Sequence, residues 1–170
     1  MTECTERSLD FHPLGRRDVT ARFDAPAITS DAGGLLLREL DAKFGFIKQL
    51  AKCFSDYRSP AFTLHSVEEL LSQRIFGIAL GYEDLNDHEQ LRHDPLMAVL
   101  AGKNDPEPTE GFALAGKSTL NRLELTPSGA SRQSRYKKIV ARHHKIEDFF
   151  VDAFLQVHDQ PPQRIVLDLD

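Results

Sequence analysis

Two aspartates near the end of the sequence, Asp168 and Asp170, have the residue type and the spacing of metal ligands. They lie in the aliphatic run over residues 165–170, which follows Pro161 and Pro162 and has the composition of a buried β-strand. Because alternate strand residues share a face, both carboxylates would project together, about 7 Å apart along the chain. Adjacent carboxylates repel each other, and a hard divalent cation such as Mg²⁺ relieves that repulsion. From these residues alone, however, an acidic and solvated chain end is the favoured interpretation, because short motifs often match by chance.

A second candidate site is a run of cations over residues 131–145, which holds six basic side chains and no acidic one. Five of the six recur at intervals of three or four residues, which on a helix places them on one face. These five are Arg132, Arg135, Lys138, Arg142 and Lys145. Such a stripe suits the phosphates of double-stranded DNA, and Tyr136 could add a sugar or base contact. The alternative is a solvated helix face, but the absence of acidic partners favours DNA contact.

Residues 111–118 match the phosphate-binding pattern GxxxxGK[ST]. That pattern binds phosphate when a buried strand delivers the glycine loop to a helix N-terminus. The residues before Gly111 are polar and contain two prolines, and the loop interior Phe-Ala-Leu-Ala is apolar. We therefore interpret this segment as the start of a helix and predict no nucleotide partner. The histidines and the two cysteines show neither zinc spacing nor a nucleophilic arrangement.

The composition is typical of a globular protein, with 41% hydrophobic and 28% charged residues among 170. The net charge is -5, so any contact with DNA must be local. Charge is segregated, since residues 61–110 hold ten acidic and three basic side chains. The polar N-terminus excludes a secretory signal, and no apolar run reaches the ~20 residues that span a membrane. We expect a cytoplasmic protein with no membrane partner.

The pattern along the chain predicts a mainly α fold. Residues 1–29 are expected to form an irregular arm, in which residues 18–24 are compatible with a short strand. A helical region over residues 30–160 follows, and its expected helices span residues 30–54, 66–79, 85–93, 95–100, 118–125 and 131–158.

Two of these helices carry specific expectations. In the helix over residues 66–79, Ser66 and Glu69 form a capping box, and Leu71, Ile75 and Ile78 should be buried. The helix over residues 131–158 should be the longest. It would bury Ile139, Ile146 and Phe150 opposite the cation stripe.

Five segments together resemble the DDE transposases of bacterial insertion sequences, specifically insertion-sequence family thirteen-eighty with its group 1 DDE transposase domain. The segments are ITSDAGGLLLRELD at 28–41, QRIFGIALGYEDLND at 73–87, LRHDP at 91–95, LAGKSTLNRLE at 114–124 and IVLDLD at 165–170. The resemblance covers nearly all of the chain from residue 18 onward.

The resemblance implies that residues 161–170 hold the first strand of an RNase H-like α/β catalytic domain. That strand supplies the first metal-binding aspartate, for which Asp170 is the first choice and Asp168 the second. The later aspartate and glutamate of the DDE set are not in this chain. We therefore expect the N-terminal part of a transposase, incomplete at Asp170, and whether it is an enzyme by itself stays open.

The implied chemistry is DNA strand cleavage and transfer by two Mg²⁺ ions in the complete protein. The implied partner is double-stranded DNA at the ends of the insertion sequence, and a homo-oligomer is compatible with this role. Two alternatives remain. One is a non-catalytic helical DNA-binding module or truncated transposase remnant, and the other is a protein-interaction domain whose acidic residues 61–110 bind a basic partner.

Overall fold

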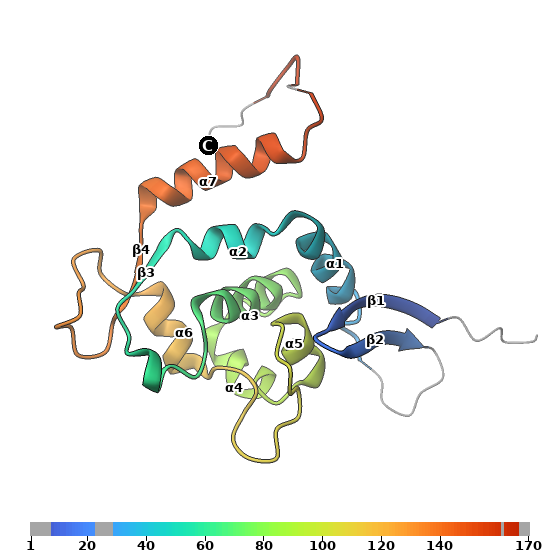
Figure 1. The fold of residues 1–170 in the computed structure, drawn as a ribbon, viewed down its shortest axis with the longest axis horizontal. Coiled ribbons are helices and arrows are strands. Elements are labelled where there is room, and N and C mark those ends of the chain that lie inside the picture. Colours follow the sequence, from blue (N-terminus) through green and yellow to red (C-terminus); the bar gives the residue numbers. More distant parts are fainter. Residues whose placement is uncertain (1–7, 23–28, 161, 167–170) are drawn as a thin grey trace, which may run out of the picture.

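The computed structural model describes residues 8–22, 29–160 and 162–166 (Figure 1). Helices form its centre, and two small antiparallel sheets lie at the edges (Figure 1). In chain order the elements are β1 (Ser8–Leu14), β2 (Arg17–Arg22), α1 (Gly34–Phe44), α2 (Phe46–Ala51), β3 (Phe54–Asp56), η1 (Pro60–Phe62), α3 (Val67–Ala79), η2 (Leu85–Asp87), α4 (His88–Leu91), α5 (Pro95–Leu100), α6 (Lys117–Glu124), β4 (Ile139–Ala141) and α7 (His143–Gln156). The predicted mainly helical class agrees with this arrangement.

The N-terminal region forms a β-hairpin where the sequence predicted an irregular arm. Strands β1 and β2 pair antiparallel, with Phe11 opposite Val19, and the pairing register shifts between Phe11 and Leu14. The strand predicted over residues 18–24 overlaps β2, but β1 was missed because Pro13 cannot donate a ladder hydrogen bond. The hairpin docks on α1, where the Arg38 guanidinium donates to the carbonyl oxygen of His12 over 2.7 Å.

The predicted helix over residues 30–54 is divided in two. It begins at Gly34 and breaks at Gly45, whose φ of 68° is in the left-handed region that glycine adopts without strain. The Asp41 carboxylate accepts a hydrogen bond from the backbone N–H of Ile47 over 2.9 Å, which caps α2. The chain then continues from α2 into β3.

Helix α3 is the centre of the hydrophobic core. The predicted capping box is confirmed, because Ser66 accepts from the N–H of Glu69 and the Glu69 carboxylate accepts from the N–H of Ser66. Leu71 is buried as predicted, but Ile75 is half-buried and Ile78 is 47% exposed, so this part of the prediction was wrong. The buried face of α3 instead holds Leu70, Leu71, Gln73, Phe76 and Gly77. These residues pack against α5, α6 and the loop before α6.

The single helix predicted over residues 131–158 was wrong. Residues 131–138 are irregular, Ile139–Ala141 form β4, and α7 begins only at His143. Strand β4 pairs antiparallel with β3, and its residues Ile139 and Val140 are both buried. Two adjacent β-branched residues buried on opposite faces suit a strand, whereas a helix would bury only one face.

Helix α7 lies along the outside of α2 (Figure 1). Its Gln156 amide donates to the carbonyl oxygen of Phe44 over 2.9 Å, and the Cys53 thiol donates to the carbonyl oxygen of Lys145 over 3.2 Å. None of its described residues is buried, so Phe150 lies on the surface rather than in the core. Of the strand predicted over residues 165–170, only Ile165 and Val166 are described; they are irregular and exposed, and the rest lies outside the described residues.

No helix among the described residues is both long enough and apolar enough to cross a lipid bilayer.

Candidate nucleic-acid interface

The five cations predicted to share one helix face do not share it. Arg135 and Lys138 lie in the irregular segment before β4 and line one hollow with Tyr136. Arg132 is exposed in the same segment, and Lys145 is exposed on α7. Arg142 turns toward β3, where its Nε donates to Ser55 Oγ over 2.9 Å and its Nη2 to Tyr57 Oη over 2.7 Å. The spacing was regular, but the strand between Lys138 and Arg142 directs the two side chains to different places.

The fold adds cations from α6 that the sequence pattern did not indicate. Two neighbouring hollows share Arg122 of α6 and Tyr136, and their volumes are about 530 and 210 Å³. Lys117 and Lys137 line the larger hollow. We define the Tyr136 surface as the residues Lys117, Arg122, Arg135, Tyr136, Lys137 and Lys138. The surface combines residues of α6 with residues of the irregular segment before β4.

Acids approach the Tyr136 surface only at Lys117, near which Asp84 and Glu89 lie, among the residues that the structure describes. Tyr136 is 57% exposed, and the guanidinium carbons of Arg135 and Arg122 lie 4.9 and 5.7 Å from its ring centroid. Within the described ranges, no cation of this surface forms an ion pair. The nearest acid in sequence, Glu124, pairs with Arg74, and residues 125–146 contain no acid.

One other cation beside the smaller hollow, Arg58, is already paired. Its guanidinium binds both carboxylate oxygens of Asp56, with distances of 2.7 to 3.1 Å. Burial raises the pKa of the Asp56 carboxyl, but the hydrogen bonds and charge of Arg58 outweigh it and hold that pKa below its usual range. Arg58 therefore adds little net charge to the surface.

The position of α6 is set by a buried amide. The Gln73 side chain donates to the carbonyl oxygen of Ala115 over 2.8 Å and accepts from the N–H of Ala115 over 3.0 Å. The same Nε2 lies 3.1 Å from Nδ1 of the fully buried His88. Gly77 makes room for that ring, because a Cβ there would lie 2.9 Å from His88 Cε1. These contacts fix the loop that leads directly into α6.

The segment that matches a phosphate-binding loop has a different geometry. Among the described residues between α5 and α6 there is no strand, and Gly116 is the N-cap of α6. The Glu89 carboxylate accepts from the N–H of Lys117 over 2.9 Å, and Lys117 Nζ donates to Asn86 Oδ1 over 3.0 Å. An internal carboxylate thus occupies the helix N-terminus at which a phosphate would bind.

The predicted metal ligands Asp168 and Asp170 lie outside the described residues. In the part of the chain that is described, no group of three or more histidine, cysteine, aspartate or glutamate side chains could hold a metal ion. The donor chemistry of the two aspartates, paired carboxylates two residues apart, suits a hard divalent cation.

The sequence model of the family Transposase DDE domain group 1 matches residues 11–170. The chain therefore belongs to this family of transposase domains. The family places the protein in DNA transposition, with DNA as partner and a divalent metal as the usual cofactor. No curated protein and no solved structure gives a significant match to the chain.

Proposed function

We propose that this chain is the N-terminal part of an insertion-sequence transposase of family thirteen-eighty, and that its Tyr136 surface binds double-stranded DNA at the ends of the element. The observation that carries the proposal is a cluster of unpaired cations around an exposed tyrosine, in a chain whose net charge is -5. Attraction for a polyanion must then be local, and the Tyr136 surface offers such a local excess of positive charge.

The scaffold of the Tyr136 surface suits a phosphate-binding role. Lys138 directly precedes β4, which pairs with β3, and the carbonyl oxygen of Lys138 accepts from the N–H of Tyr57 over 2.8 Å. Arg122 stands on α6, whose preceding loop is fixed by Gln73. Cations on fixed elements lose little conformational freedom on binding, so they hold DNA in one register.

The catalytic part of the proposal rests on Asp170 and Asp168. In the complete protein, the proposed RNase H-like domain begins with the strand that carries them, and Asp170 is the first choice for the metal ligand. Bound Mg²⁺ would supply activation of the attacking oxygen and stabilisation of the leaving oxygen in strand cleavage and transfer. The cytoplasm as location and self-association at the element's ends belong to the same proposal.

A salt titration of DNA binding tests the role of the Tyr136 surface. The double variant Arg135→Ala, Lys138→Ala should weaken binding to end and random duplexes alike. Each cation that contacts a phosphate displaces counterions from the DNA, and this release makes binding weaker at high salt. The loss of two such contacts should therefore reduce the magnitude of the slope of log K against log salt by about two. The charge-matched control is Lys48→Ala, Lys52→Ala, which removes two exposed cations from α2 and its C-cap.

Two outcomes of the titration would contradict the proposal. Equal loss in both double variants would show that net charge alone sets the affinity. An unchanged slope in the Arg135, Lys138 variant would place the DNA-binding surface elsewhere. Far-ultraviolet circular dichroism on each variant separates either outcome from a loss of folding.

A further inference from the structure

The side chain of Phe62 is 88% exposed at the edge of the Tyr136 surface. It ends the short helix η1 and lines the smaller hollow together with Arg135, Tyr136 and Lys138. A single exposed apolar residue is ordinary, so exposure alone indicates nothing. The position of Phe62, beside an aromatic ring and several unpaired cations, is the informative observation.

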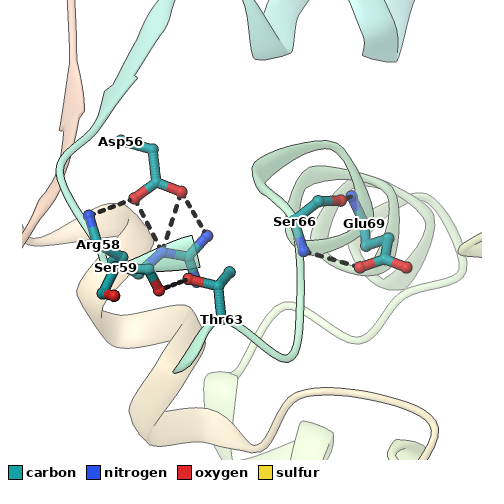
Figure 2. A network of polar contacts seen from close by, with 6 residues as sticks. All are labelled: Asp56, Arg58, Ser59, Thr63, Ser66 and Glu69. Atoms are coloured by element: carbon teal, nitrogen blue, oxygen red, sulfur yellow. Dashed lines mark hydrogen bonds and ion pairs between the residues drawn. The ribbon is translucent and has the colours of Figure 1, made fainter. Parts of the chain in front are cut away.

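The turn that presents Phe62 is held from both ends (Figure 2). Before it, the Asp56 carboxylate binds the guanidinium and the backbone N–H of Arg58. After it, Thr63 Oγ1 donates to the carbonyl oxygen of Ser59 over 2.8 Å, and Ser66 begins the capping box of α3. The N–H of Phe62 itself donates to the carbonyl oxygen of Ser59 over 3.0 Å. The ring is therefore presented by an ordered turn.

The same turn is tied to the cation segment. The N–H of Tyr57 donates to the carbonyl oxygen of Lys138 over 2.8 Å, so the backbone before Phe62 and the backbone that carries Arg135 and Lys138 form one unit. A ring beside unpaired cations is complementary to a ligand that offers both an anionic backbone and a flat apolar face. Nucleotides whose bases are not paired have this combination, whereas a paired duplex offers mainly its phosphates.

We propose that the Phe62 ring stacks on an unpaired base of the bound DNA, while Arg135 and Lys138 hold the adjacent phosphates. The inference rests on the proposed DNA-binding function and narrows the ligand to duplex DNA with locally unpaired bases. Tyr136, whose ring is flanked by two guanidinium groups, forms the other aromatic wall of the same hollow.

The test compares the 170-residue chain on a matched duplex and on the same duplex with a short internal bubble of unpaired bases. The chain should bind the bubble duplex at least about fivefold more tightly, the lower end of what one stacked base contributes. Phe62→Ala should remove this preference and leave the affinity for matched duplex unchanged. A fluorescent 2-aminopurine in the bubble should be quenched by the unaltered chain and not by Phe62→Ala.

Leu64 is the matched control, because it is 87% exposed two residues away and does not line the hollow. Leu64→Ala should keep the preference for the bubble duplex. Phe62→Trp should also keep the preference that Phe62→Ala loses, because tryptophan provides a larger ring for stacking. Phe62→Leu should not restore it, since leucine has no stacking face. A Phe62→Leu variant that keeps the full preference would overturn stacking and indicate an apolar wedge.

The remaining outcomes separate this inference from the proposed function. If the chain binds both duplexes equally, the stacking inference falls while DNA binding stands. If the chain binds neither duplex, both fall. If Phe62→Ala leaves the bubble preference intact but abolishes self-association in sedimentation, Phe62 belongs to a contact between protein copies and the inference is wrong.

Discussion

At the scale of single residues, Gln73 connects three parts of the core. Its amide bonds both polar groups of Ala115 and lies against His88, while the side chain itself is fully buried. A buried amide with all its partners in place stabilises one arrangement of the neighbouring elements. Because Ala115 lies directly before α6, this side chain determines where the cations of α6 are placed.

Gln73→Leu should lower the free energy of unfolding by several kcal/mol. The apolar side chain fills a similar volume, but it leaves the N–H and carbonyl oxygen of Ala115 buried without partners, at about 1–3 kcal/mol for each group. Urea unfolding measures the change. The control is Gln90→Leu on the exposed side of α4, which should leave the urea midpoint nearly unchanged. A similar midpoint in both variants would show that the amide clamp is dispensable.

His88 should make stability depend on pH in the mildly acidic range. Burial lowers the pKa of His88 below its ordinary value of 6.5, and the nearby Arg74 charge lowers it further. The unfolded chain then binds the proton more readily than the folded chain. Stability is therefore full above about pH 6.5 and falls as pH drops through that value toward the folded pKa.

The measurement is the free energy of unfolding of the unaltered chain and of His88→Leu at several values between pH 7.5 and 5. The variant should show the shallower decline whatever its stability at pH 7.5. His65, whose pKa is also lowered mainly by burial, leaves a residual slope in both proteins. Parallel declines in the two proteins would show that His88 is not the group that titrates.

At the scale of elements, α3 separates a buried face from an exposed one. Leu71→Ala should cost about 2–5 kcal/mol, because Leu71 is buried in the hydrophobic core and its removal leaves a cavity there. Ile78→Ala should cost close to the ~0.5 kcal/mol typical of surface substitutions, since Ile78 is half exposed. Urea midpoints of the two variants measure the difference. Equal losses would mean that the register of α3 differs from the one described.

The sequence predicted α3 well because its signals are local. Ser66 and Glu69 mark its start, and the apolar spacing continues from there to Gly77. The same local reasoning failed at β4, because its partner β3 lies about 85 residues upstream and no local pattern reports that pairing. Regular spacing of cations then indicated a helix where the buried pair Ile139 and Val140 required a strand.

The candidate interface was predictable only in part for the same reason. Arg135, Tyr136 and Lys138 were identified, since an acid-free basic segment is visible in the sequence. Arg122 and Lys117 were missed because they join the surface through the packing of α6. Arg142 was expected on the same helix face as the other cations, because spacing reveals neither its N-cap position nor its bonds to Ser55 and Tyr57.

At the scale of the whole molecule, charge is unevenly distributed along the chain. The acids concentrate over residues 61–110, while residues 125–146 contain cations and no acid. In the proposed function, an overall charge of -5 would repel DNA from most of the protein and leave the Tyr136 surface as the place where DNA is attracted. In this proposal, DNA binding depends on the cations of the Tyr136 surface, whereas strand cleavage depends on Asp170 and Asp168.

This separation gives the last prediction, for the proposed catalytic strand in a transposase with its full set of acids. Asp170→Ala should abolish Mg²⁺-dependent strand cleavage, because it removes a proposed metal ligand, while binding to the ends persists through the Tyr136 surface. Cleavage of a labelled end duplex and a gel-shift titration of the same duplex measure the two effects. The Arg135, Lys138 double variant is the converse control, since it should weaken binding while cleavage recovers at saturating protein. Full cleavage by Asp170→Ala, with loss in Asp168→Ala alone, would move the metal ligand two residues upstream.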